Sequence, residues 1–459
     1  MSVSDDPART RPSDPIPPAP AEPPSGTGRS TRRIVVSAAI GNFAEWYDFA
    51  VYGVVASVMA THFFPTSDPT VGLIGAYAIF ALTYVSRPLG GLFAGWLGDT
   101  LGRRRALSFT IILMCAGTAL IGVLPGYAAI GVGAPVLLTL CRLLQGLGTG
   151  GEYSSAISFV YEHSAPRDRA VRISYLVTTT FVGISAAVLA AGLLSTVLGE
   201  EAFEAWGWRL LFLAAAPLGL AGVYLRSKVA ETPTFEKAAQ ERQELQGRER
   251  RAATPIRETL RTQVPTMVLF FLVVSAYALI TPVLSSYFIT FMQREGGLSS
   301  GQSYYVSLAI NVVMIAATLL TGRFMARYGL QRTFVLGGVF IAVVAVPSFA
   351  VATQGVGGAL LGGALLSAGK GIVAVAGAMA MSHMFPAAVR VTAGALAYNV
   401  CTIAFGAAGP TIGIWLNAST GSSLTFSVYI GVVAVISAAA AVMGRARLRA
   451  RDTEPVAAN

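Results

Sequence analysis

Two acidic residues inside a long apolar stretch could carry proton chemistry. Glu45 and Asp48 are three residues apart, so on a helix both carboxylates face the same side. Glu45 follows Arg33 by 12 residues, which on a helix places it about 18 Å further along. Burial disfavours the charged form of a carboxylate, so such a group can exchange a proton near neutral pH. We interpret both acids as a proton-coupling site; a static charge pair is the alternative.

Arg87 lies at a comparable depth in the next apolar stretch, 12 residues before Asp99. Its guanidinium can pair with the two acids of the first stretch. It can instead bind a substrate carboxylate through two parallel hydrogen bonds. Tyr84, three residues earlier, shares its helix face and is a second candidate for contact with substrate.

A polar stripe runs along the fourth apolar stretch. Arg142, Gln145, Thr149 and Glu152 follow one another at helical spacing. Arg142 and Glu152 would lie about 15 Å apart along the axis, so each needs a separate partner. Nearby glycines such as Gly146 allow a neighbouring helix to approach closely. We interpret Arg142 and Gln145 as substrate contacts and Glu152 as a third proton-coupling candidate, against the alternative of purely structural pairing.

Lys370 is an isolated base in the second half of the chain, 13 residues into an apolar stretch. A lone ammonium at that depth is costly unless it meets an anion. We expect it to pair with an acid of the first or fourth stretch, or to receive an anionic substrate. Asn399 is a further candidate for substrate contact, although a hydrogen bond between helices would also account for it.

The composition shows which elements must position these residues. Of 459 residues, 54% are hydrophobic and 12% are charged, about half the charged share of an ordinary soluble protein. Apolar stretches of roughly 20 residues recur, and each can cross a hydrocarbon core of ~30 Å. The sequence predicts an all-α integral membrane protein and excludes most soluble enzymes and nucleic-acid binders. The twelve predicted spans are residues 34–60, 71–97, 106–125, 134–160, 170–198, 208–226, 264–291, 303–325, 333–352, 357–384, 389–416 and 424–444.

The basic residues explain the net charge of +10 through topology. They gather in alternate loops, whereas the opposite loops hold almost none; residues 292–302 contain only Arg294. The positive-inside rule therefore places both termini and the middle segment in the cytoplasm. Nucleic acid is not needed as a partner. The three cysteines stand apart within apolar stretches, so we expect small buried residues and no metal site.

A long polar segment divides six spans from six. This layout predicts two six-helix bundles related by a pseudo-twofold axis along the membrane normal. The first residues hold eight prolines between Pro7 and Pro24 and are expected to be disordered. The predicted parts are a cytosolic tail at 1–31, an N-terminal bundle at 32–226, a central cytosolic loop at 227–263, a C-terminal bundle at 264–445 and a second cytosolic tail at 446–459.

The loop after the second span has the composition of a conformational latch. Glycines permit a tight turn, and an acid beside arginines can hold one conformation and release it; an ordinary charged turn is the alternative. The loop after the eighth span repeats the glycine and arginine spacing with Ala326 in place of the acid, which indicates duplicated halves. The candidate latch residues are Gly95, Asp99, Gly102, Arg103 and Arg104.

This loop resembles the GxxxDRxGRR signature of the major facilitator superfamily, with Thr100 where a base is usual. Further segments resemble the metabolite:H⁺ symporter family, which includes bacterial proline/glycine-betaine, α-ketoglutarate, shikimate and citrate transporters. The resemblance extends over roughly residues 32–445, and the stretch 195–236 is most similar to the proline/betaine symporters. The segments that carry it are 41–49, 87–91, 142–153, 206–209, 231–236 and 385–390.

The resemblance implies a transporter that works by alternating access, energised by the proton gradient without a cofactor. The buried charges favour import, by proton symport, of a small polar metabolite that bears a carboxylate, either an organic acid or a zwitterion such as proline or betaine. A proton antiporter that exports a metabolite or natural product is the alternative. No enzyme motif is present. We expect a monomer in the bacterial inner membrane whose partners are protons, lipid and the substrate.

Overall fold

The computed structural model describes residues 42–101, 103–149, 152–162, 164–230, 256–386 and 390–449, and within these ranges no residue forms a strand. Each predicted span contains helix. The first half begins with a helix over residues 42–54. Its further long elements are α2 (Ala56–Phe63), α3 (Pro69–Leu101), α4 (Arg103–Val123), α6 (Gly133–Gly148), α7 (Glu152–Glu162), α8 (Arg169–Leu198), α10 (Trp208–Leu213) and α11 (Ala215–Ala230).

The second half repeats this arrangement. Two of its spans contain a π-helical turn, η3 (Val283–Tyr287) and η4 (Thr402–Ala407). The helices of this half are α13 (Ile256–Pro282), α14 (Phe288–Arg294), α15 (Ser300–Tyr328), α16 (Leu330–Ala352), α17 (Gly355–His383), α18 (Arg390–Cys401), α19 (Ala408–Thr420) and α20 (Thr425–Met443). Among the described residues, eight helical stretches are long and apolar enough to cross a membrane.

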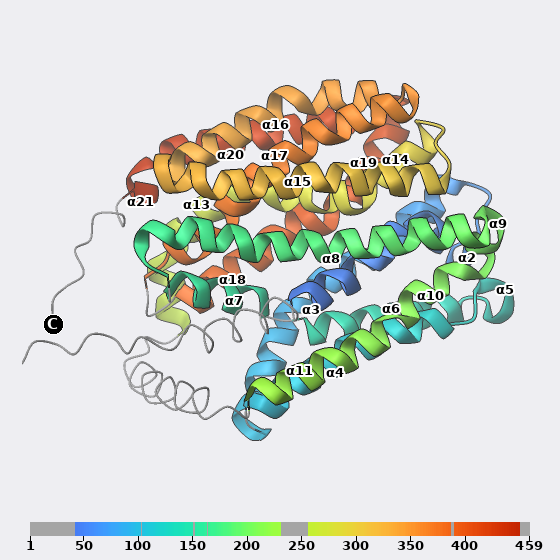
Figure 1. Ribbon diagram of the computed structural model, residues 1–459, viewed down its shortest axis with the longest axis horizontal. Coiled ribbons are helices and arrows are strands. Elements are labelled where there is room, and N and C mark those ends of the chain that lie inside the picture. Colours follow the sequence, from blue (N-terminus) through green and yellow to red (C-terminus); the bar gives the residue numbers. More distant parts are fainter. Residues whose placement is uncertain are drawn as a thin grey trace, which may run out of the picture.

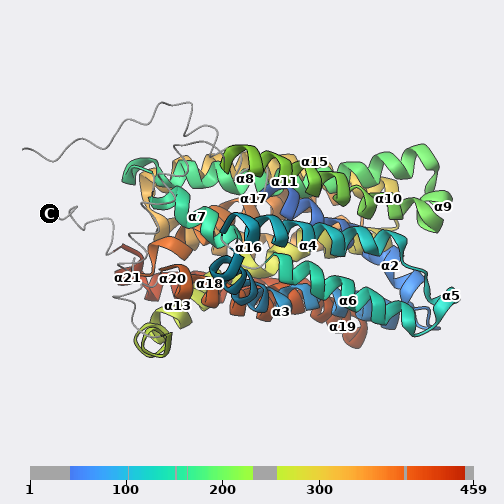
Figure 2. The same cartoon turned by 90° about the horizontal axis from the view of Figure 1, so that it is seen from below.

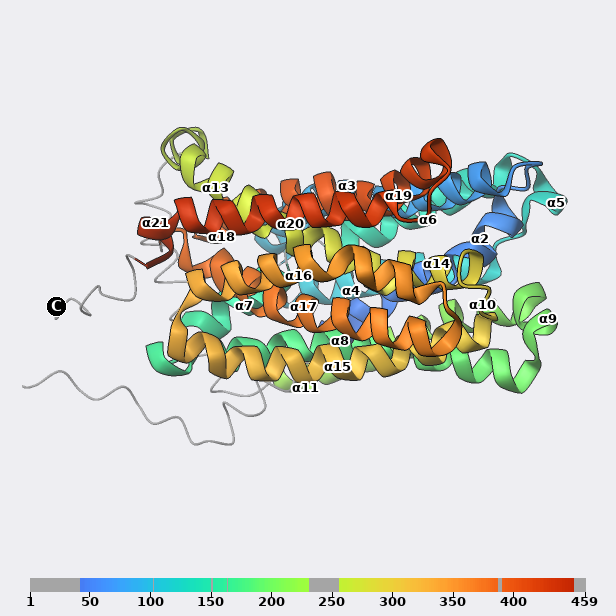
Figure 3. The same cartoon turned by 90° about the horizontal axis from the view of Figure 1, so that it is seen from above.

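The two halves form bundles that meet along two lines of contact. Helix α8 packs against α15 over much of its length, and α3 packs against η4 and α19. Figure 1 shows α8 and α15 side by side in the middle of the molecule. Seen from below, helices α3, α4 and α6 of the first half lie in front (Figure 2). Seen from above, α15, α16 and α20 of the second half lie in front (Figure 3). The interface between the bundles therefore runs along the helices.

Side chains are distributed as expected for a molecule in lipid. Large apolar residues such as Leu140 and Val343 are exposed on the outer faces of the bundles, with exposed fractions of 51% and 68%. Charged residues such as Asp48, Arg142 and Lys370 are instead buried. A hydrocarbon solvent stabilises this arrangement, because ionisable groups inside a membrane face the interior of the bundle. The buried charges therefore mark the region where a polar substrate can pass.

Two local features depart from the predicted spans. The fourth span was expected to be one continuous helix, but α6 ends at Gly148 and α7 begins at Glu152. The polar stripe from Arg142 to Glu152 is therefore divided between two helices. In the seventh span the π-helical turn η3 follows Pro282 directly, because proline lacks an N–H and its ring crowds the preceding turn. Interruptions of this kind are frequent at functional sites.

Glycine permits the close approach of α3 and α6 that the sequence predicted. A Cβ atom on Gly146 would lie 2.7 Å from the carbonyl oxygen of Thr83 on α3. The predicted tail at 1–31 lies outside the described residues, as do residues 231–255 of the predicted central loop and 450–459 of the second tail. The boundaries of the predicted parts stay predictions there.

Candidate functional site

A small, partly open cavity of about 20 Å³ lies between the two halves. This space accommodates about one water molecule. Glu45 and Arg87 contribute opposite charges from the first half. Asn399 and Tyr398 contribute from the second half. The complete lining consists of Glu45, Arg87, Thr149, Tyr153, Ala395, Tyr398 and Asn399.

Arg87 lines the cavity, and two aromatic rings hold its side chain in position. Its guanidinium carbon lies 5.0 Å from the centre of the Phe49 ring and 5.2 Å from that of Tyr84. Such contacts stabilise a cation by the electrostatic field of the ring face. Tyr84 was predicted to contact substrate, and here its ring contacts Arg87 instead of lining the cavity. It acts in this arrangement as a support for the arginine.

Asp48 lies in a separate hydrogen-bonded network on the same helix as Glu45. Gln145 donates from Nε2 to Asp48 Oδ2 at 2.7 Å and to Thr118 Oγ1 at 2.8 Å. Arg142 donates in turn to Gln145 Oε1. Oδ1 of Asp48 is buried and has no hydrogen-bond partner among the described residues. The two acids therefore face different surroundings, one a cavity and the other a buried basic network.

Arg142 is fully buried, and aromatic rings take the place of a direct carboxylate partner. Its guanidinium carbon lies 4.3 Å from the centre of the Tyr52 ring and 5.3 Å from that of Phe80. Nε and Nη2 have no hydrogen-bond partner within the described ranges. A buried arginine with open donors is unusual, because buried polar groups are nearly always paired. Arg142 can therefore accept a further anionic partner when the halves move.

Lys370 points from α17 toward α13. Its ammonium donates to the hydroxyl of Thr281 and to the carbonyl oxygen of Tyr277, the latter at 3.5 Å. It also lies 4.0 Å from the centre of the Tyr277 ring. Within the described part of the chain no ion pair joins it to an acid. The expected pairing with an acid of the first or fourth span is therefore not formed in this structure, because Lys370 faces the seventh span.

Polar contacts join the halves at the end that the positive-inside rule predicts to face outward. Ser57 donates to Oε1 of Gln293 at 2.8 Å. The hydroxyls of Tyr77 and Thr290 lie 2.9 Å apart. Ser286 donates to the carbonyl oxygen of Gly53 at 2.9 Å. We call these six residues the outer gate. The sequence did not reveal them, because isolated serines and threonines in a span give no signal of their partner.

A second set of contacts joins the halves at the end that is predicted to face the cytoplasm. The hydroxyls of Tyr153 and Tyr277 lie 3.4 Å apart, and those of Ser158 and Ser382 lie 3.3 Å apart. Tyr161 and Nδ1 of His383 lie 3.3 Å apart. Contacts between the halves are thus present at both ends, with the cavity between them.

The remaining predicted residues lie where little is described. Gly95 and Asp99 fall near the end of α3, and Arg103 and Arg104 begin α4, but the placement of their side chains lies outside the described part of the chain. Gly102 itself lies outside the described residues. Glu152 begins α7, and its side chain is likewise outside what the structure describes. The latch and the third proton-coupling acid stay predictions.

Known proteins define the class of this molecule. Residues 38–406 match the family described as the Major Facilitator Superfamily. A proline/betaine transporter of Salmonella typhimurium is 35% identical over 88% of this chain and 81% of its own length. The glycine betaine/proline/ectoine/pipecolic acid transporter OusA of Dickeya dadantii is 36% identical over the same shares. An ectoine/proline transporter of Corynebacterium glutamicum is 31% identical over 90% of this chain.

Solved structures agree on the fold. A D-xylose–proton symporter superposes with a TM-score of 0.68 over 90% of this chain and 97% of its own, at 18% identity. The same class of protein bound to a bromodeoxyglucose gives a TM-score of 0.70 at 17% identity, over 91% and 96% of the two chains. The predicted twelve-helix fold in two bundles is confirmed. This chain belongs to the major facilitator superfamily and is a multi-pass membrane transporter.

Proposed function

We propose that the protein imports a zwitterionic osmolyte, such as proline or a betaine, together with protons. The observation that supports this most directly is the cavity between the halves, where Glu45 and Arg87 place opposite charges at one site. A zwitterion carries the complementary pair of charges. The proline, betaine and ectoine transporters that share about a third of the sequence support the same substrate class.

The lining of the cavity suits both ends of such a substrate. Arg87 is the partner for the carboxylate, because a guanidinium offers two parallel donors. Tyr153 and Tyr398 present aromatic faces, with ring centres 6.1 Å apart. Aromatic faces bind quaternary ammonium groups, and the Glu45 carboxylate adds a negative charge beside them. Asn399 supplies a polar contact from the second half. The cavity of about 20 Å³ is too small for the substrate, so binding requires that the halves separate.

We assign the proton to the first span, with Asp48 as its principal carrier. When Asp48 is charged, Gln145 and the positive field of Arg142 stabilise it; when it takes up a proton, Arg142 is free for an anionic group. This arrangement couples the charge state of Asp48 to the contacts of Arg142. Glu45 and Glu152 are further acids of the same pathway, and Lys370 assists the substrate carboxylate. The proton gradient supplies the energy without a cofactor.

Transport in this proposal follows from rocking of the halves about the site. The outer gate opens first, substrate and proton bind, and the inner contacts at Tyr153 and Ser158 then separate. The latch residues of the loop between α3 and α4 hold the inner side closed. The protein acts as a monomer in the bacterial inner membrane, with both termini in the cytoplasm.

Uptake into proteoliposomes tests the proposal. The purified protein is reconstituted, and radiolabelled glycine betaine and proline are supplied outside while the lumen is made alkaline. Symport predicts accumulation above the external concentration that a protonophore abolishes. An exporting antiporter would instead accumulate substrate when the lumen is acidic. Absence of uptake for zwitterions, together with uptake of a dicarboxylate, would contradict the proposed substrate class.

A further inference from the structure

A second and larger cavity lies at the outer end of the molecule, away from the central cavity that Glu45 and Arg87 line. Its volume is about 220 Å³, roughly ten times that of the central cavity. It lies between the two halves, because Thr70 at the start of α3 lines it together with residues of α14 and α19. We call it the outer vestibule. Its position on the line where the halves meet places it on the route of a substrate that arrives from outside.

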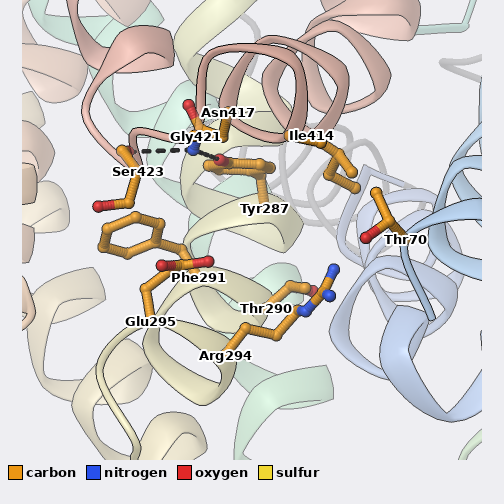
Figure 4. Close-up of a pocket in the computed structure, with 11 residues that line it drawn as sticks. Thr70, Tyr287, Thr290, Phe291, Arg294, Glu295, Ile414, Asn417, Gly421 and Ser423 are labelled. Carbon is orange, nitrogen blue, oxygen red and sulfur yellow. Dashed lines mark hydrogen bonds between the residues drawn. The ribbon is translucent and has the colours of Figure 1, made fainter. Parts of the chain in front are cut away.

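Two opposite charges line the outer vestibule. Arg294 ends α14, and Glu295 follows it; both side chains are exposed. Figure 4 shows Arg294 extending past Thr290 toward Thr70, whereas Glu295 lies on the other side, beside the ring of Phe291. Among the described residues, no ion pair or hydrogen bond engages either charged group. Both charges are therefore available to a ligand between them.

The sequence itself marks Arg294 as exceptional. The loops on this side of the membrane are almost free of bases, and within residues 292–302 Arg294 is the only one. A base on the outer side opposes the positive-inside tendency, so topology does not account for it. Binding of a ligand accounts for an arginine at this position.

The vestibule and the outer gate share one residue, Thr290. Thr290 lines the vestibule and at the same time contacts the Tyr77 hydroxyl of the other half at 2.9 Å. Below it, the ring of Tyr77 contacts Phe80, and Phe80 contacts the buried guanidinium of Arg142. A ligand in the vestibule therefore lies beside the Tyr77–Thr290 contact, which must separate before the substrate can pass.

We propose that the outer vestibule is a first binding site for the zwitterionic substrate, distinct from the central cavity. Arg294 binds the carboxylate, and Glu295 together with the Phe291 ring binds the cationic end. Exposed charges at a cleft raise the local concentration of a complementary ligand and its rate of association. This site rests on the proposed function, because it takes its ligand from the same substrate class.

Uptake kinetics of Arg294 variants test the site. With glycine betaine as probe, Arg294→Ala is expected to raise KM by roughly tenfold while the maximal rate changes little. Arg294→Lys keeps the charge and should recover most of the loss. The matched control is Arg327→Ala. Arg327 is an exposed arginine in the last turn of α15, and its replacement should leave KM unchanged. Equal KM values for the unmodified protein and Arg294→Ala would overturn the site.

Protection from a membrane-impermeant thiol reagent gives a second, direct readout. Ala418→Cys places a thiol in the vestibule, and Ser419→Cys places one beside it on the same exposed stretch, outside the lining. The native cysteines are buried, so labelling reports the new position. Glycine betaine should slow the labelling of Ala418→Cys several-fold, and this protection should be lost when Arg294 is also replaced. The labelling rate of Ser419→Cys should not change. Equal protection of both positions would overturn the site.

These outcomes separate the two proposals. If the unmodified protein takes up no zwitterion, the proposed function fails and the vestibule site fails with it. If uptake is normal but the Arg294 variants match it, only the vestibule site fails.

Discussion

Asp48 and Arg142 are joined through one amide group, that of Gln145. The amide nitrogen donates to Asp48, and the amide oxygen accepts from Arg142. The acid lies on the first span and the base on the fourth, so a change in the charge of Asp48 alters the contacts of a second helix. This connection is a physical route from a proton to the packing of the first bundle.

Neutralising the acid should uncouple transport from the proton gradient. Asp48→Asn preserves the shape of the side chain and removes the proton that Asp48 would carry. We expect accumulation driven by an alkaline lumen to disappear, while exchange of labelled for unlabelled substrate continues. Both are measured in proteoliposomes.

The control for this variant is Glu201→Gln, which neutralises an exposed acid at the outer end. It should accumulate substrate like the unmodified protein. Full accumulation by Asp48→Asn would remove Asp48 from the coupling mechanism and leave Glu45 as the stronger candidate.

Removing the connecting amide should destabilise the fold. Gln145→Leu retains volume but deprives Asp48, Thr118 and Arg142 of a hydrogen-bond partner at once. Buried polar groups left unpaired cost ~1–3 kcal/mol each, so we expect a loss of about 3 kcal/mol in the free energy of unfolding. The midpoint of thermal unfolding in detergent measures this.

A matched substitution on the same helix gives the baseline. Thr139→Val removes only a local hydrogen bond to the carbonyl of Pro135. Its effect should stay within about 0.5 kcal/mol. If Gln145→Leu unfolds at the same temperature as this control, the amide does not stabilise the buried charges.

The sequence was sufficient to place the spans, because hydropathy is a local property. It did not determine which acid meets which base. Residues three apart on a helix differ by about 60° around the axis, which keeps Glu45 and Asp48 on one face but lets each meet a different neighbour. Glu45 shares a cavity with Arg87, whereas Asp48 reaches Arg142 through Gln145.

The contacts between the halves could not be predicted from the sequence, for a related reason. Ser57 and Gln293 lie 236 positions apart, and nothing in either neighbourhood identifies the other. Lys370 illustrates the same difficulty. Its depth was predicted from its position in the span, but its partner Thr281 depends on how two helices of the second bundle are rotated. Such rotations are fixed by packing over whole helices.

Lys370 offers a prediction in which function and stability change in opposite directions. Lys370→Met removes a buried ammonium and keeps an apolar chain of similar length. Substrate binding should weaken, with KM for glycine betaine raised about tenfold, which corresponds to ~1.4 kcal/mol. The thermal midpoint should stay equal or rise, because replacing a buried ion by an apolar side chain is often neutral or stabilising.

Thr281→Val is the companion variant. It retains the ammonium but removes the hydroxyl that accepts from it. A buried charge that loses a partner destabilises the protein, so this variant should unfold at a lower temperature than the unmodified protein. An unchanged KM in Lys370→Met would exclude the lysine from the substrate site.

The close contact between α3 and α6 should tolerate no side chain at Gly146. A Cβ there would lie 2.7 Å from the Thr83 carbonyl oxygen, an atom of the backbone that cannot move aside alone. Gly146→Ala must therefore force the two helices apart, at a cost of ~1–3 kcal/mol. Because α3 carries Arg87 and α6 carries Gln145, the separation should also raise KM. Thermal unfolding and uptake measured on the same preparation give both values.

Gly357→Ala, in the first turn of α17, is the control. No atom lies within 4 Å of the position that its Cβ would occupy. Alanine is favoured over glycine in a helix by about 0.5–1 kcal/mol, so this variant should be as stable as the unmodified protein or slightly more stable. Gly146→Ala and Gly357→Ala could instead show the same thermal stability and the same KM. In that case α3 and α6 would not be tightly packed at Gly146, and this contact would not determine the positions of Arg87 and Gln145.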